Sequence, residues 1–126
     1  MEKLVNCKHI MDIEFIEGFS GGNEGLSLNV VLSNKTKKRI TFDRIWDFRY
    51  CIENAVVYRG TQFGREDDMK SSILIVENSE YIKYFEQQVS GTLPVDKLKE
   101  YIIFDKVDTV ISALAFEDPE VEDITE

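Results

Sequence analysis

The segment from Ile73 to Gly91 constrains the fold more than any other part of the sequence. It begins with Ile73–Val76, a run of branched apolar residues that is typical of a strand buried on both faces. Asn78 and Ser79 interrupt this run, and either side chain can accept hydrogen bonds from the first turn of a helix. A helix over residues 79–90 is therefore expected to follow.

The predicted helix has one apolar face. At 100° per residue, a stripe about 100° wide contains its large apolar side chains, which are Tyr81, Ile82, Phe85 and Val89. Gly91 can adopt the left-handed conformation that ends a helix. A helix with one apolar stripe needs a sheet to pack against.

Alternating apolar and polar residues predict several strands. The expected strands cover residues 10–17, 26–33, 40–43, 48–58, 73–76, 98–104 and 107–116. The first two are expected to form an antiparallel hairpin, and residues 60–72, which lack periodicity, a mobile loop. We therefore expect an α+β fold: a single antiparallel sheet of about six strands, strongly curved, with one main helix (about 79–90) packed on it.

Length and net charge limit the number of domains and the kinds of partner that are expected. The 126 residues suffice for one core, so a single domain over residues 1–126 is expected. A net charge of −9 argues against nucleic acid as a partner and favours a basic protein. The acidic C-terminal tail from about residue 117 holds six acids and no base, which leaves −3 for the body. This tail is either a solvated end or an aid to association with a basic partner.

The sequence predicts neither a secretory signal nor a membrane span, so a cytoplasmic location and no membrane partner are expected. Cys7 and Cys51 are too few for a disulfide framework and are expected to be reduced. Together with His9 they form the beginning of a metal site, but their spacing does not fit zinc sites. We expect no metal and no cofactor.

Two other patterns invite a catalytic interpretation. The pairs Asp12 with Glu14 and Asp67 with Asp68 have the groups that acid–base catalysis needs, but surface acids are mostly just solvated. The glycine-rich residues 18–25 suggest phosphate binding, yet phosphate-binding loops open a helix and this one leads into a strand. We expect a flexible hairpin connection there and no catalytic residue.

The predicted strand 48–58 carries candidate partner-binding residues. Arg49 and Glu53 share one of its faces, and Asp43 or Arg44 of the preceding strand is expected across from them. Such a cluster is either an internal network that sets strand register or a recognition surface. Trp46 is either a core residue or an interface anchor. Including two loop acids, the candidates are Trp46, Arg49, Glu53, Asp67 and Asp68.

The order of residues 40–55, 77–91 and 98–121 resembles that of small immunity-type proteins of bacterial polymorphic-toxin and contact-dependent inhibition loci. The matching positions are Phe42, Arg49 and Glu53, then Ser79, Tyr81, Ile82 and Phe85 in a Ser-led helix, and a Tyr-bearing hairpin that ends near Pro119. Such proteins often have His where this chain has Glu100, before Tyr101. The resemblance implies a protein that binds and neutralises a cognate toxin and catalyses nothing.

Two functions of different classes follow from these patterns. The first is a non-catalytic protein-binding domain, an immunity-type inhibitor of a bacterial toxin whose partner is a basic toxin domain. The alternative is a small-molecule-binding or small enzymatic β-rich domain with a pocket between sheet and helix.

Overall fold

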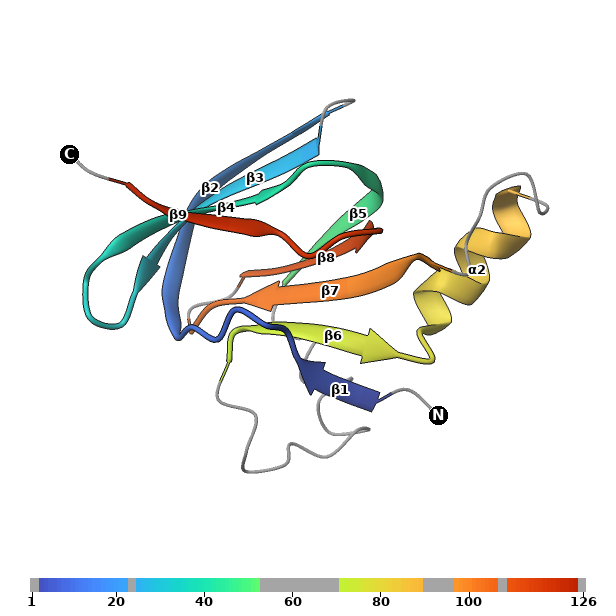
Figure 1. The fold of residues 1–126 in the computed structure, drawn as a ribbon, viewed down its shortest axis with the longest axis horizontal. Helices are drawn as coiled ribbons and strands as arrows, with labels where there is room; N and C mark the ends of the chain where they lie inside the picture. Colours follow the sequence, from blue (N-terminus) through green and yellow to red (C-terminus); the bar gives the residue numbers. More distant parts are fainter. Residues whose placement is uncertain (1–2, 23–24, 53–70, 90–96, 107–108, 125–126) are drawn as a thin grey trace.

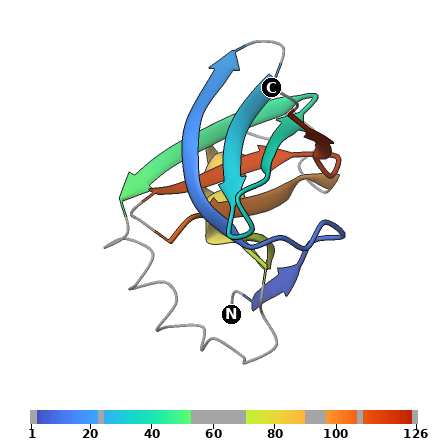
Figure 2. The same ribbon diagram turned by 90° about the vertical axis from the view of Figure 1, so that its left-hand side faces the viewer.

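The computed structural model describes residues 3–22, 25–52, 71–89, 97–106 and 109–124. These residues form two antiparallel sheets that pack face to face, and their strands cross steeply (Figures 1 and 2). The five-stranded sheet has the order β1-β6-β7-β8-β5, and the four-stranded sheet has the order β2-β3-β4-β9. The strands are β1 Lys3–Asn6, β2 Ile13–Gly22, β3 Gly25–Leu32, β4 Lys37–Phe42, β5 Ile45–Ile52, β6 Ile73–Glu77, β7 Lys99–Phe104, β8 Thr109–Ala115 and β9 Glu120–Asp123.

The expected single sheet of about six strands is wrong, because the chain changes sheets between β4 and β5. Only Asp43 and Arg44 connect these two strands, yet β4 pairs with β3 and β9, whereas β5 pairs with β8. Arg49 consequently lies opposite Ser112 rather than opposite residues 43–44. Period-two alternation indicates which face of a strand is buried, but it does not indicate which strand is its neighbour.

The main core lies between the two sheets. Phe42 and Tyr101 meet there with ring centroids 5.1 Å apart, and both side chains are fully buried. Ala113 and Ala115 of β8 lie on this inner face, while Leu114 lies on the outer one. Other inward residues are Leu26, Leu28, Val30 and Ile40 of the four-stranded sheet and Ile73, Ile103 and Ile111 of the five-stranded sheet. Fully burying one such side chain contributes about 1.5–3 kcal/mol.

The hairpin predicted from the first two strands is confirmed as β2–β3, but it is longer than expected. Residues 18–22 continue β2 instead of forming a loop. Gly25 has φ of 131°, and a Cβ atom there would lie 2.2 Å from the Phe42 carbonyl oxygen. Glycine is therefore required at this position.

The expected helix is present as α2, Glu80–Val89, and it is the one helix among the described residues. Asn78 has a left-handed backbone, and Ser79 Oγ caps the helix by accepting the Ile82 N–H at 3.1 Å. This short helix covers only one end of the five-stranded sheet, on the face away from the other sheet (Figure 1). It is therefore not the main layer over the sheet that we expected. No helix of the described residues has the length and apolar character to cross a membrane.

Sequence patterns missed two strands, β1 and β9. β9 is part of the acidic tail, and it pairs with β4. Its Asp123 accepts a hydrogen bond from Lys38 Nζ at 2.7 Å, and Glu122 accepts one from Arg39 at 3.2 Å. This part of the tail is thus a strand and not a solvated end. The expected strand beyond residue 52 and most of the expected loop 60–72 lie outside the described residues.

Candidate functional site

Strand β5 occupies an edge of the five-stranded sheet and carries two of the predicted partner-binding residues, Trp46 and Arg49. Among the described strands β8 is its one partner, and the pairing is regular from Asp47 to Ile52. β5 therefore offers a partner two side-chain faces and a backbone edge. The other three candidates, Glu53, Asp67 and Asp68, lie outside the described residues.

A bulge at the start of β5 positions Trp46. Ile45 pairs with Ala115 and Asp47 with Leu114, so Trp46 is the extra residue. Its ring packs edge-on against Phe116 at 5.2 Å and joins the apolar cluster beneath α2. The Trp46 Nε1 atom is buried, and no hydrogen-bond acceptor reaches it within the described structure. Trp46 is thus half-buried and fixes the end of β5 against the outer face of the sheet.

Arg49 lies on the α2 side of β5. Its guanidinium carbon is 3.6 Å from the ring centroid of Tyr81 and 5.7 Å from that of Tyr84. A cation over an aromatic face is attracted by the negative face of the ring. Tyr84 is 55% exposed, and Arg49 is also exposed. Arg49 and Tyr84 together present a cation and an aromatic ring to solvent.

Tyr81 stays neutral beneath this pair. Its hydroxyl is buried and makes no hydrogen bond of ordinary geometry in the described structure, although Asp47 and Arg49 lie nearby. Burial, and then the neighbouring Asp47 carboxylate, raise the pKa of Tyr81 well above its usual value. Tyr81 therefore acts as an uncharged platform for Arg49.

The opposite face of β5 carries a second aromatic group, which we call the aromatic trio: Phe19, Phe48 and Tyr50. The Phe19 ring stacks on Tyr50 at 5.6 Å and meets the edge of Phe48 at 6.0 Å. Phe19 is 41% exposed and Tyr50 is 53% exposed. Since Phe19 comes from β2 and the other two from β5, the trio spans the seam between the two sheets.

Sequence reasoning missed the trio and Tyr84 as candidate binding residues. The alternation of β5 places Phe48 and Tyr50 on one face, and this signal was available from the sequence. Phe19, however, lies in the glycine-rich segment that we assigned to a loop. A loop assignment gave no reason to place Phe19 beside β5.

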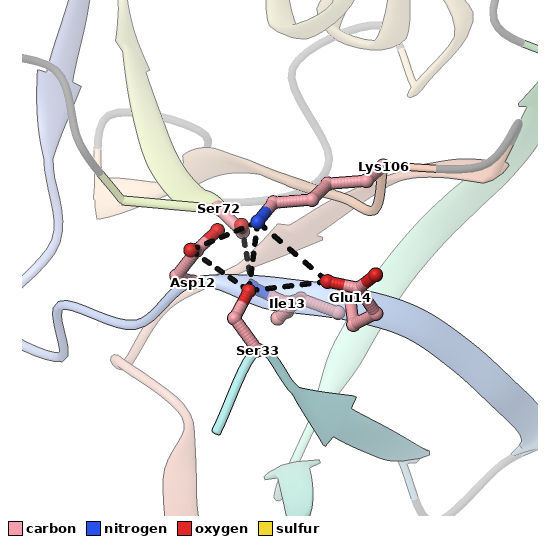
Figure 3. A network of polar contacts seen from close by, with 6 residues as sticks. All are labelled: Asp12, Ile13, Glu14, Ser33, Ser72 and Lys106. Atoms are coloured by element: carbon pink, nitrogen blue, oxygen red, sulfur yellow. Dashed lines mark hydrogen bonds and ion pairs between the residues drawn. The ribbon is translucent and has the colours of Figure 1, made fainter. Parts of the chain in front are cut away.

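The carboxylate pair Asp12 and Glu14 forms a polar cluster with Ser33 and Lys106 (Figure 3). Lys106 Nζ lies 3.1 Å from Asp12 Oδ2, 3.6 Å from Glu14 Oε2 and 2.8 Å from Ser33 Oγ. Ser33 Oγ in turn donates to Asp12 Oδ2 at 2.8 Å. Both acids therefore share one lysine.

The electrostatics of this cluster favour a structural role. The hydrogen bonds from Ser33 and Lys106 lower the pKa of Asp12, and the bond to Asp12 raises the pKa of Lys106. Both groups stay charged near neutral pH, where a general acid or base would have to exchange its proton. Backbone bonds act in parallel: the Lys106 N–H donates to the Glu14 carbonyl at 3.2 Å. The cluster joins the β2–β3 hairpin to the turn after β7.

The three residues that we considered as the beginning of a metal site, Cys7, His9 and Cys51, are only partly described. Cys7 is buried, and burial raises the pKa of its thiol. Within the described ranges, no three His, Cys, Asp or Glu side chains lie close enough to hold a metal ion. The side chain of Cys51 lies outside the described part of the chain.

An open groove between sheet and helix corresponds to the pocket that we expected for a small-molecule protein. It is lined by β6, the start of α2 and residues 98–99. Its buried polar residue is Ser79, which donates to the buried Glu100 carboxylate at 2.5 Å and accepts the Ile82 N–H. The Ser79 hydroxyl therefore already donates one hydrogen bond and accepts another.

No family model matches the sequence, and comparisons with curated proteins and with solved structures found no match either. Function is therefore inferred from the residues and their geometry.

Proposed function

We propose that this protein is a non-catalytic protein-binding domain whose binding surface is β5 with its flanking aromatic side chains. The observation that carries the proposal is the aromatic trio, in which Phe19 and Tyr50 stack although Phe19 is 41% exposed and Tyr50 is 53% exposed. Single exposed apolar residues are common on protein surfaces. Aromatic side chains gathered at one place are instead typical of the central part of an interface.

The α2 side of β5 supports the same function. Arg and Tyr are enriched among the residues whose truncation most weakens complexes. Arg49 is already held over Tyr81, so it loses little conformational freedom on binding. A partner that contacts Arg49 and Tyr84 on one side and the trio on the other would enclose the edge of β5.

The resemblance to immunity-type proteins and the charge of the chain suggest the kind of partner. With a net charge of −9, the protein would attract a basic toxin domain at long range. The aromatic and Arg side chains would then slow dissociation once contact is made. We therefore propose neutralisation of a cognate bacterial toxin by occlusion.

The small-molecule alternative is less well supported. The groove beside α2 is open, and the hydroxyl of its buried residue Ser79 is engaged by Glu100 and the Ile82 N–H. A ligand there would have to displace these bonds to gain polar contacts of its own, whereas small-molecule sites usually place polar groups ready for the ligand.

The proposed function is tested by identifying the partner and then truncating matched phenylalanines. The partner would be captured from the native cell with the tagged protein and identified, and its affinity for purified variants measured. Phe19→Ala should weaken binding by about 30-fold or more, which corresponds to a hot spot of at least ~2 kcal/mol. Phe15→Ala is the control, because Phe15 is similarly exposed on β2 at 37% and is not part of the trio.

Equal effects of the two substitutions, or no effect of Phe19→Ala, would refute the assignment of the surface. A partner that is a metabolite or a substrate turned over by the protein would refute the proposed function itself.

A further inference from the structure

The four strands at sheet edges differ in how well they are protected from pairing with another chain. β1 and β9 have four residues each, and β9 is acidic. β2 is long, but two register shifts interrupt it. Short strands, charges and bulges are the usual protection of a sheet edge. β5 has eight residues, and although it has a bulge at Trp46 and the charges of Asp47 and Arg49, its pairing from Asp47 to Ile52 is the longest uninterrupted stretch at a sheet edge among the described strands.

The outward backbone groups of β5 can be identified from one hydrogen bond. The Phe48 N–H is bonded at 3.0 Å to the carboxylate of its own neighbour Asp47, so it does not point toward β8. In an antiparallel ladder the direction of these groups alternates along the strand. The backbone groups of Phe48, Tyr50 and Ile52 therefore face the edge, and those of Asp47 and Arg49 bond to β8.

The sequence of β5 is complementary to itself in one antiparallel register. If a two-fold axis passes through Phe48, Asp47 of one copy lies opposite Arg49 of the other, and the reverse pair forms by symmetry. An axis at Asp47 or Arg49 would place like charges opposite each other, and an axis at Tyr50 would place Arg49 opposite Cys51. Among axes placed at Asp47, Phe48, Arg49 and Tyr50, only the Phe48 axis makes two opposite-charge pairs.

We propose that β5 pairs antiparallel with β5 of a second copy of this chain, about a two-fold axis at Phe48, which joins the two five-stranded sheets edge to edge. The Phe48 amide exchanges its bond with Asp47 for a bond with the partner copy. The Asp47 carboxylate then turns to Arg49 of that copy. Asp47 and Arg49 form non-hydrogen-bonded pairs across the new ladder, where side chains approach most closely.

This pairing does not rest on the proposed function. It uses the backbone edge of β5 together with Asp47 and Arg49, so a toxin that encloses this edge would compete with the second copy. The side chains of the aromatic trio are not needed for the pairing. A dimer would present two aromatic trios, and a monomer would still present one. The self-association test below needs only the purified protein.

The experiment is a charge exchange followed by analytical ultracentrifugation over a range of concentrations. The wild type should show a reversible monomer–dimer equilibrium. Asp47→Arg should raise the dimer dissociation constant at least about tenfold, because two attractions become two repulsions. This variant also has less overall negative charge, so general repulsion between copies decreases and cannot explain weaker association. The double variant Asp47→Arg with Arg49→Asp should restore association to within about threefold of wild type.

A second pair of variants tests the backbone ladder independently of charge. Tyr50→Pro removes an N–H that faces the edge, and proline is tolerated on edge strands when the missing N–H faces solvent. Tyr50→Ala removes the same side chain but keeps the N–H. Dimerisation should be lost in Tyr50→Pro and retained in Tyr50→Ala, with both variants folded by circular dichroism.

Three results would overturn the proposal. The first is a wild type that remains monomeric up to about millimolar concentration, where even weak pairing would appear. The second is a double variant that associates no better than Asp47→Arg. The third is equal association of the two Tyr50 variants.

Discussion

Two aromatic pairs with similar distances between their ring centroids occupy opposite environments in this protein. Phe42 and Tyr101 meet between the sheets with centroids 5.1 Å apart, and both are essentially inaccessible to solvent. Phe19 and Tyr50 stack at 5.6 Å on the surface, where about half of each side chain is exposed. Contact distance alone does not distinguish a core pair from a surface pair. What differs is the area removed from water, and this area sets the stabilisation.

The position of each strand in its sheet explains the difference. Phe42 is on β4, which has strands on both sides, and it faces the other sheet. Phe19 and Tyr50 are on β2 and β5, the edges that end the two sheets on the same side of the molecule. No further described strand covers that side. The interior pair is expected to hold the fold together, and the surface pair remains accessible to a partner.

The largest expected effect comes from truncating one phenylalanine of each pair. Phe42→Ala should lower the free energy of unfolding by about 3–5 kcal/mol, because it leaves a cavity between the sheets. Phe19→Ala should lower it by about 1 kcal/mol or less, since its site is open to water and cannot form a closed cavity. Denaturant unfolding measures both values. Similar losses in the two variants would show that the seam between β2 and β5 is as well packed as the core.

An intermediate effect is expected at Ser79, which extends the comparison to polar groups. Ser79→Ala removes the cap of α2 and the hydroxyl that donates to the fully buried Glu100 carboxylate. We expect a loss of about 1–3 kcal/mol in the free energy of unfolding. Ser79→Thr keeps a hydroxyl and serves as the control. An alanine variant as stable as the wild type would mean that Glu100 has sufficient other partners.

The smallest effect is expected at the exposed cluster around Lys106. Asp12→Asn should lower the free energy of unfolding by less than about 1 kcal/mol near neutral pH, because exposed ion pairs contribute little to stability. The pKa of Asp12 is lowered in the folded state. Its carboxylate therefore contributes to stability at pH values above the ordinary pKa of 3.8, and this contribution is lost as the pH falls through and below that value.

The difference in stability between wild type and Asp12→Asn should therefore shrink on acidification, and urea unfolding at several pH values measures it. A difference that grows at low pH would have the wrong sign for a salt-bridged carboxylate. High salt should also reduce the difference at neutral pH.

Local patterns in the sequence predicted many elements well. The branched run at Ile73 is β6, the Ser79-led helix is α2, and the strand expected over residues 107–116 contains β8. Each of these depends on residues close together in the chain, so the periodicity of side-chain burial carries the information.

Only the tertiary structure decided how the strands were divided between sheets and which residues met on the surface. Two residues, Asp43 and Arg44, take the chain from one sheet to the other, and nothing in the alternation marks that change. In the trio, Phe19 contacts residues of β5 that are some thirty positions later in the sequence. Arg49 of β5 lies over the ring of Tyr81 in α2, at a similar separation in sequence. Such contacts depend on strand order, and strand order is set by the packing of the whole core rather than by the residues adjacent to each strand.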